Sequence, residues 1–221
     1  FIQAILVGLI NVVFTIVAMA LIDKLGRKPL LAIGVTGVAL SMFLLSYSFN
    51  AATYTLTNDS ISKLPKEINV KQISVLQDKT FQSDTEFKQA ITQAIGVAAQ
   101  KKYESELISS SITMNAMLIL FGILGFVASF AISLGPVMWV LFSELFPNKI
   151  RGIAISFVGF INSAVSFVVQ LVFPWELEKL GSTLTFLLYG IFALIGLVFI
   201  MKLLPETKGK SLEELEAILV K

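Results

Sequence analysis

Five charged residues stand where apolar stretches of the chain end, and ion pairing is the chemistry open to them. They are Asp23, Arg27, Glu144, Arg151 and Glu206. In residues 23–29 and 144–152 an acid lies close to a base and beside glycine or proline, where the backbone can bend. Ordinary interfacial charge is one interpretation, because exposed ion pairs contribute about 0–1 kcal/mol. The occurrence of this combination in both segments gives weight to the other interpretation, a set of ion pairs that holds a gate shut.

Three amides and one tryptophan inside apolar stretches could bind a polyhydroxylated ligand. Asn11, Asn162 and Gln170 each offer two donors and an acceptor. Trp139 follows the helix breaker Gly135-Pro136, and its flat face suits the apolar face of a sugar ring. An aromatic residue at the membrane interface is the alternative for Trp139. For the amides, a ligand-facing cavity and ordinary helix packing both stay open.

Other kinds of chemistry are excluded or find no support in the sequence. The chain has no Cys and no His, which excludes disulfides, thiol chemistry and histidine proton relays. It shows no nucleophile–base pair, phosphate-binding loop or metal cluster, so we expect neither an enzyme nor a cofactor. The net charge of +2 gives no indication of nucleic acid, and no nucleic-acid partner is expected.

The elements that position these residues are transmembrane helices. The chain is 56% hydrophobic and 14% charged, with a mean hydropathy of +0.84, which is typical of a membrane protein. About 20 apolar residues cross a bilayer, and the sequence predicts five spans at 2–22, 30–49, 113–146, 150–173 and 183–204. The third would be roughly 50 Å long, so we expect a break at Gly135-Pro136. Small residues such as Gly34 and Ser133 favour close helix packing.

A polar stretch at residues 50–111 interrupts the spans, with seven basic and seven acidic residues. Its patterns predict a short strand or hairpin at Ile68, Val70, Ile73 and Val75, and one amphipathic helix at 84–107. Ser83 and Glu86 form a possible capping box. We expect an all-α membrane protein with a small soluble insertion between its second and third spans.

Four segments follow from this pattern. Residues 1–49 form two helices joined by a basic loop, 50–111 form the insertion, 112–204 form three helices, and 205–221 form an amphipathic tail starting near Ser211. Short loops rich in Lys and Arg face the cytoplasm. This rule places loop 23–29, loop 147–152 and the C-terminus in the cytoplasm, and the insertion outside. Phe1 lies directly in an apolar stretch, so we expect a piece of a longer protein.

Three motifs resemble those of a known family. They are residues 23–29 (DKLGRKP), residues 135–152 from GPVMW through Glu144 to Arg151-Gly152, and residues 205–214 (PETKGKSLEE). In this order they are similar to the signatures of the sugar porter family of the major facilitator superfamily. The resemblance covers the whole chain except the insertion, which is far longer than the family usually has there.

The resemblance implies a fold and a function. The five spans would be helices eight to twelve of twelve, and the partners would be a monosaccharide such as xylose or glucose, the lipid bilayer and a missing N-terminal half. Transport by alternating access is expected in a bacterial inner membrane, as proton symport or as facilitative uniport. No acid lies near the middle of a span, so a proton-carrying group would be in the missing half. A sugar sensor and a remnant without ligand are the alternatives.

The resemblance also implies two sets of site residues. The sugar-binding set is Asn11, Phe130, Gly135, Trp139 and Asn162. The set that resembles an inward gate is Asp23, Arg27, Glu144, Arg151 and Glu206.

Overall fold

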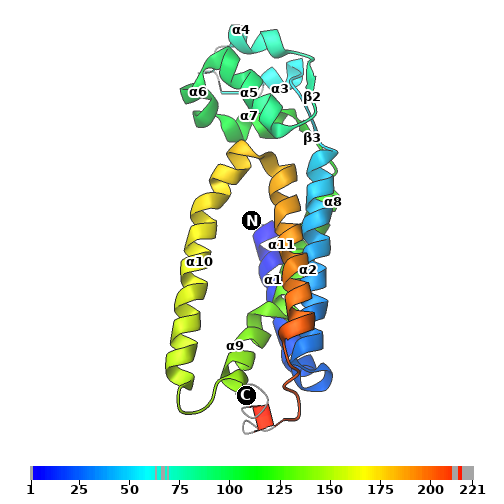
Figure 1. Cartoon of the computed structure of the whole chain (residues 1–221). Helices are drawn as coiled ribbons and strands as arrows, with labels where there is room; N and C mark the ends of the chain where they lie inside the picture. The colour runs from blue at the N-terminus through cyan, green and yellow to red at the C-terminus, as the bar shows by residue number, and fades with distance from the viewer. Residues whose placement is uncertain (1, 63, 66–67, 69, 211–213, 216–221) are drawn as a thin grey trace. The chain divides into compact units, whose positions relative to one another are not determined.

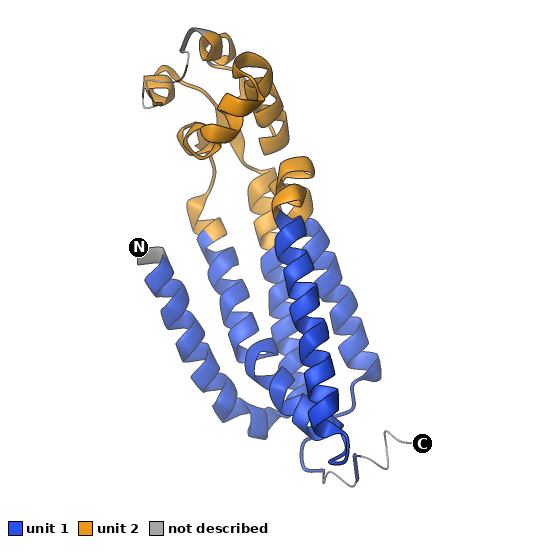
Figure 2. Ribbon diagram, turned by 90° about the vertical axis from the view of Figure 1, so that its left-hand side faces the viewer, with its two compact units in different colours: residues 1–43, 120–173, 187–221 blue, residues 44–119, 174–186 orange. Residues whose placement is uncertain are grey.

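The structure is a computed structural model that describes residues 2–62, 64–65, 68, 70–210 and 214–215. Its elements are labelled in Figure 1, and they divide into two compact units, shown in Figure 2. Unit 1 comprises residues 1–43, 120–173 and 187–221. Unit 2 comprises residues 44–119 and 174–186. Unit 1 holds most of each apolar helix, and unit 2 holds the insertion together with the turn between the last two helices.

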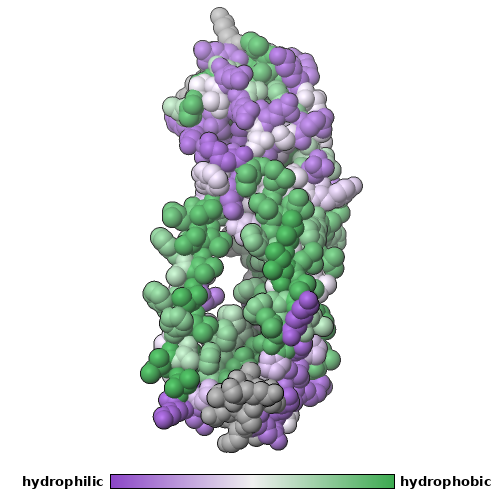
Figure 3. Space-filling model, in the orientation of Figure 1, coloured by the Kyte–Doolittle hydropathy of each residue, from purple (hydrophilic) through white to green (hydrophobic). Residues whose placement is uncertain are grey.

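Five helical spans among the described residues are long and apolar enough to cross a membrane. They are α1 (Ile2–Leu25), α2 (Arg27–Asn50), α8 (Ala116–Ile132) together with α9 (Leu134–Leu145), α10 (Arg151–Lys179) and α11 (Gly181–Leu203). Hydrophobic residues dominate the surface of these helices, whereas the insertion is mainly hydrophilic (Figure 3). The predicted fold class, all-α with five membrane-spanning helices, is therefore confirmed.

The connections at the helix ends are shorter than the sequence suggested. Between α1 and α2 only Gly26 is non-helical, with φ +97°, so the expected loop at 23–29 is wrong. Between α10 and α11 only Leu180 intervenes, because α10 continues through Pro174 to Lys179. Apolar composition marks where a helix leaves the membrane, whereas backbone hydrogen bonding continues beyond that point.

The third span is broken close to the predicted position. α8 ends at Ile132 and α9 begins at Leu134, and Ser133 between them has φ −129° and ψ −88°. The Ser133 hydroxyl donates to the Ser129 carbonyl oxygen at 2.7 Å. Pro136 then falls in the first turn of α9, where an N–H has no intrahelical partner to lose. The break thus lies just before Gly135-Pro136.

Small residues bring α2 and α8 together, as predicted. A Cβ at Gly34 would overlap the Ser133 side chain, and one at Gly37 would overlap Ser129. A Cβ at Gly125 of α8 would in turn lie 2.9 Å from the Ser41 hydroxyl oxygen. Such close backbone approach is how helices associate in lipid. One turn before Gly34, Leu30 and Leu31 of α2 pack on Val137 and Leu141 of α9.

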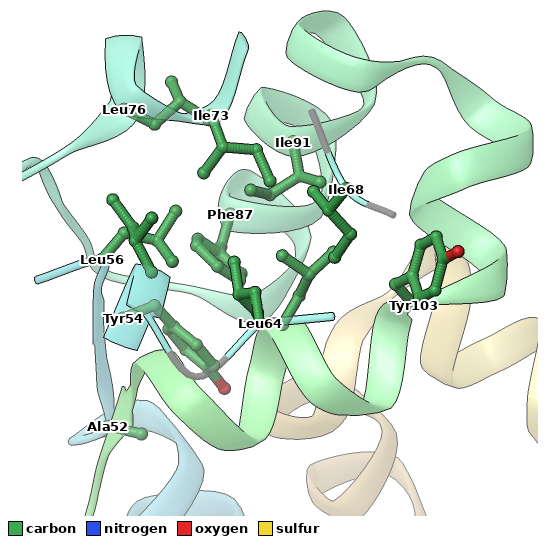
Figure 4. Close-up of a cluster of buried hydrophobic side chains, with 12 residues drawn as sticks. Ala52, Tyr54, Leu56, Leu64, Ile68, Ile73, Leu76, Phe87, Ile91 and Tyr103 are labelled. Carbon is green, nitrogen blue, oxygen red and sulfur yellow. The ribbon is translucent and has the colours of Figure 1, made fainter. Parts of the chain in front are cut away.

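The insertion contains a small antiparallel sheet of order β2-β1-β3, formed by β1 (Thr53–Thr55), β2 (Thr80–Phe81) and β3 (Ile112–Thr113). Tyr54 pairs with Phe81 on one side and with Ile112 on the other. The sheet closes on short helices: α3 (Asn58–Ser62), α4 (Val70–Ile73), η1 (Ser74–Leu76), α5 (Asp84–Ile95), α6 (Val97–Lys102) and α7 (Glu104–Ser111). Its apolar core is shown in Figure 4.

Two local predictions for the insertion are wrong. The strand or hairpin expected at 68–75 is wrong, because residues 70–76 are helical, as α4 followed by η1. Ile73 is buried while Val75 is 68% exposed, an arrangement that a strand with both on one face does not allow. The helix at 84–107 is three helices, interrupted at Gly96 (φ +83°) and at Tyr103 (φ −113°, ψ 18°). Both interruptions let Phe87, Ile91 and Leu107 enter one core.

The predicted helix caps have different outcomes. The Ser83 hydroxyl accepts the N–H of Glu86 at 3.1 Å, as a capping box requires. Glu86 Oε2 accepts the N–H of Gln82 at 3.2 Å, one residue earlier than in a regular box. The tail helix expected from Ser211 lies outside the described residues, apart from Glu214 and Leu215.

Candidate functional site

Arg27 and Glu144 form a charged pair at the end of unit 1 where α1 meets α2. Arg27 Nε donates to both carboxylate oxygens of Glu144 at 3.1 Å, and Nη2 donates to Oε1 at 2.7 Å. The side chains are only 14% and 20% exposed. α2 begins at Arg27 directly after Gly26, and Glu144 occupies the last turn of α9, so two helix ends meet in one bidentate contact.

The segment after α11 closes over this pair. The Thr207 hydroxyl donates to Glu144 Oε2 at 2.6 Å. Glu206 accepts the backbone N–H groups of Arg27 at 3.0 Å and Lys28 at 3.1 Å, which are the free donors at the N-terminus of α2. Glu206 therefore caps α2 from 179 residues away in the sequence.

Gly26 makes this cap possible. A Cβ there would lie 2.7 Å from Glu206 Oε2, and its φ of +97° favours glycine in any case. Lys208 Nζ also donates to the Lys24 carbonyl oxygen at 2.6 Å, at the C-terminus of α1. The turn between α1 and α2 is thus held on both sides by the residues that follow α11.

Of the remaining two residues of the predicted charge set, one lies at the edge of this cluster and the other lies outside it. Asp23 accepts from Arg27 Nη1 at 3.2 Å, but it is 79% exposed, so this contact contributes little. Arg151 donates through Nε to the Phe146 carbonyl oxygen at 3.2 Å. Its Nη2 is buried and, within the described part of the chain, has no hydrogen-bond partner. The structure therefore joins Asp23, Arg27, Glu144 and Glu206, and leaves Arg151 outside their contacts.

Backbone donors lower the pKa of Glu206. Burial alone acts in the opposite direction and is the largest single effect, but it is outweighed by the N–H groups of Lys208, Arg27, Lys28 and Thr207. A carboxylate with a lowered pKa stabilises the fold while it is ionised. That contribution is complete above the ordinary value of 4.5 and is lost as the pH falls through the folded-state pKa.

Glu206→Gln is therefore expected to lower the thermal unfolding midpoint at pH 7 and to have a much smaller effect at pH 3. The measurement is a thermal melt of the chain in detergent micelles at both pH values. Glu106→Gln, on the exposed side of α7, is the control and should change neither midpoint. An equal loss at pH 7 and pH 3 would show that the carboxylate charge is not the cause.

The predicted sugar-binding residues occupy exposed positions in unit 1. Trp139 is 49% exposed on α9 and packs edge-on against Phe142, with the ring centroids 6.1 Å apart. Phe130 is 43% exposed at the end of α8, and its ring would lie 3.7 Å from a Cβ on Gly135. The structure thus places Phe130 and Gly135 together across the helix break.

The two predicted asparagines lie on other helices. Asn11 is exposed on α1, which packs against α9, and its carbonyl oxygen accepts the Thr15 hydroxyl at 2.8 Å. Asn162 is exposed on α10, which buries none of its described residues. Figure 3 shows an opening between α10 and the neighbouring helices of unit 1. No contact within the described residues joins Asn162 to Trp139 or to Asn11.

Sequence reasoning missed Thr207 and Lys208. Both stand in the segment 205–209 that was singled out for Glu206, so the signal was present. A hydroxyl or an amine at a helix end has many possible partners. Only the fold shows that Thr207 reaches Glu144 and that Lys208 reaches the carbonyl oxygen of Lys24.

A bundle of membrane-spanning helices, one of them broken, with a charge cluster that joins their ends, defines part of a membrane transport protein. A family model described as "Sugar (and other) transporter" matches residues 1–66 and 90–219. The chain belongs to this family of sugar transporters, the sugar porters of the major facilitator superfamily. Residues 67–89 of the insertion lie outside the match.

The individual proteins that the chain is similar to are also sugar transporters. The chain is 32% identical to the D-xylose-proton symporter of Escherichia coli (strain K12) over 222 residues, which covers 98% of this chain and 33% of the relative. It is 29% identical to facilitated glucose transporter member 10 of Xenopus tropicalis over 236 residues, covering 95% of this chain and 42% of the relative. The inward-open structure of the xylose transporter XylE from E. coli matches with a TM-score of 0.64 at 30% identity, covering 98% and 35% of the two chains.

The chain thus spans about a third to two fifths of the length of these relatives. Its five spans correspond to the C-terminal part of a transporter of this superfamily, as the motifs predicted.

Proposed function

We propose that this chain forms helices eight to twelve of a transporter that moves a monosaccharide, a pentose or a hexose, across the membrane by alternating access. The observation that carries the proposal is the cluster of Arg27, Glu144, Glu206 and Thr207 in a chain of this family. The cluster ties α2, α9 and the segment after α11 at one end of unit 1. Breaking these contacts frees that end of the bundle, which is what an inward gate must do.

The exposed polar and aromatic residues support a sugar site shared with the rest of the transporter. Asn11, Trp139 and Asn162 have faces that no described residue of the chain covers. Amides would bond sugar hydroxyls, and the Trp139 ring would lie against the sugar. The uncovered α10 and the opening beside it would be filled by the seventh helix and the N-terminal half (Figure 3). Arg151 Nη2 would find its partner there as well.

Proton-coupled symport is the mode that we favour, because the bacterial relative is a xylose-proton symporter. Facilitative uniport is the second candidate, since a facilitated glucose transporter is also a relative. In the described spans the acidic side chains stand only at helix ends, as Asp23, Glu144, Glu176 and Glu178 do. A proton-carrying acid would then belong to the N-terminal half. The membrane is a bacterial inner membrane with the basic loops and the C-terminus in the cytoplasm, and no enzymatic step or cofactor is required.

In the full-length transporter, Trp139→Ala and Asn162→Ala should each reduce sugar uptake about tenfold, as a loss of about 1.4 kcal/mol of binding predicts. The measurement is counterflow of labelled xylose and glucose in proteoliposomes, with and without a pH gradient. The control is Trp175→Ala, which removes the other tryptophan, an exposed one on α10. Wild-type uptake by both site variants would refute the site. Equal rates of sugar uptake with and without the pH gradient would establish uniport.

A further inference from the structure

Unit 2 contains two adjacent pockets between the insertion and the turn that joins α10 to α11. Their volumes are about 430 Å³ and about 380 Å³, within the range of roughly 300–1,000 Å³ that small-molecule sites occupy. Lys88 and Glu178 line both. Neither pocket includes a residue of the proposed transport site, which belongs to unit 1.

Gln100 carries an unpartnered amide in the wall of the larger pocket. The residue is only 7% exposed, on α6 just after the turn at Gly96. Within the described part of the chain, its side chain forms no hydrogen bond, and its amide atoms are not sealed from the pocket. Gln100 therefore presents two donors and one acceptor to whatever fills the pocket.

Tyr54 presents a second such group in the smaller pocket. The residue is 2% exposed, and its ring stacks on Phe87 with the centroids 5.5 Å apart. Figure 4 shows its hydroxyl directed away from the apolar cluster. The Tyr54 hydroxyl has no hydrogen-bond partner among the described residues, and its oxygen is not completely buried. Burial, followed by the charge of Asp84, raises the pKa of Tyr54 to about 12, so it remains a donor at neutral pH.

The larger pocket is lined by three lysines and one acid, and the smaller by one lysine and three acids. Lys88, Lys101 and Lys179 line them together with Asp84, Glu104 and Glu178. Lys88 pairs with Glu104 at 2.8 Å, and Lys101 pairs with Glu178 at 3.5 Å. A ligand that occupies both pockets meets three basic and three acidic groups, a total charge that does not favour an ionic ligand. The remaining polar groups are amides and hydroxyls, namely Gln89, Gln93, Thr85 and Thr92 beside Gln100. This composition suits a neutral molecule with many hydroxyl groups.

The walls of the pockets are held by one carboxylate. Asp84 Oδ2 accepts both the N–H and the hydroxyl of Ser182 at 3.0 Å, and Oδ1 accepts the N–H of Thr85 at 2.9 Å. Asp84, in the first turn of α5, thereby caps the N-terminus of α11. Ser46 adds a bond to the Thr183 carbonyl oxygen at 2.8 Å. The pockets are thus bounded by elements that are fixed to each other.

From these observations we infer that the two pockets form a saccharide-binding site of the insertion, separate from the transport site. The ligand is a neutral mono- or disaccharide whose hydroxyls bond the Gln100 amide and the Tyr54 hydroxyl. Thr85, Lys88 and Gln89 of this site lie in the stretch that the family model does not match. Tyr54 and Gln100 themselves lie in stretches that the family model matches, and none of the residues that line the two pockets belongs to the proposed transport site.

The test uses the 221-residue chain in detergent micelles, carrying Trp139→Ala and Asn162→Ala to disable the proposed transport site. Saturation-transfer difference NMR is titrated with D-xylose, D-glucose and maltose. At least one of them should bind saturably. Gln100→Leu should weaken that binding tenfold or more, and Tyr54→Phe should weaken it severalfold. The control Gln72→Leu is exposed and outside both pockets, so it should leave binding unchanged.

Both pocket variants, Gln100→Leu and Tyr54→Phe, are chosen to preserve the packing around the substituted side chain. Leucine fills nearly the volume of Gln100, and phenylalanine keeps the stack on Phe87, and thermal melts verify both. Absence of saturable binding for all three sugars would overturn the site. Wild-type affinity in both pocket variants would do the same. Binding that is present in the unmodified chain but lost in the Trp139→Ala, Asn162→Ala background would overturn it as well, while supporting the proposed transport site.

Discussion

Replacement of Arg27 by alanine should destabilise the chain by about 2–3 kcal/mol, because it leaves a largely buried carboxylate without its charged partner. Among the described residues, Glu144 would keep only its hydrogen bond from the Thr207 hydroxyl. The Glu206 cap on α2 uses backbone N–H groups and survives the substitution. The loss therefore measures the side-chain contacts of Arg27, which are the bidentate pair with Glu144 and the longer bonds to the exposed Asp23 and to the Ile22 carbonyl oxygen.

Lys28→Ala is the matched control. Lys28 is the neighbouring basic residue, and it contacts the cluster only through its backbone N–H. A second readout reports opening of the helix ends. The chain has no cysteine, and Leu141 is 5% exposed in the apolar cluster next to Glu144. In a Leu141→Cys background, Arg27→Ala should increase the rate of maleimide labelling severalfold, whereas Lys28→Ala should not. Unchanged labelling in Arg27→Ala would refute a gate that this pair holds shut.

Gly34→Leu is expected to have an effect of similar size, about 3 kcal/mol, through packing. A Cβ at Gly34 already overlaps the Ser133 side chain, so a leucine must push α2 and α8 apart or distort the break between α8 and α9. Gly34→Ala should give an intermediate loss. The measurement is reversible unfolding in mixed micelles.

Gly196→Leu on α11 is the control, since nothing lies within 4 Å of its added Cβ, and it should be nearly neutral. Equal stability of Gly34→Leu and Gly196→Leu would show that α2 and α8 do not depend on this contact.

The spans could be predicted because hydrocarbon imposes length and apolarity on every crossing helix. The break near Gly135-Pro136 followed from the same limit on length. The insertion could not be read in this way. Ile68 and Ile73 carry strand-forming side chains, yet both enter a core assembled from distant segments, and tertiary packing sets their conformation. Gly96 ends α5 by a positive φ that periodicity does not detect.

For the candidate site, the sequence indicated several of the residues but not which of them contact each other. Arg27 and Glu144 stood out because each lies near a residue of opposite charge beside glycine or proline at a helix end, and the structure pairs them with each other. Arg151 stood out for the same reason but makes only a local bond. Whether two charges meet depends on the register of packed helices, which a linear pattern does not contain. Gln100 and Tyr54 gave no signal, because burial of a polar side chain is visible only in the fold.

The bond between Asp84 and Ser182 joins residues that are 98 positions apart, and this has a consequence for biosynthesis. At about 5–20 residues per second, the ribosome delivers Ser182 roughly 5 to 20 s after Asp84. During this interval the insertion has neither the helix N-terminus that Asp84 caps nor the wall that Glu178 supplies. The contact between α5 and the N-terminus of α11 can therefore form only after the chain has been synthesised through Ser182, whereas the apolar core of the insertion uses residues 52–112 alone. The insertion can thus form its core early and join the end of the helix bundle only when the last helix begins.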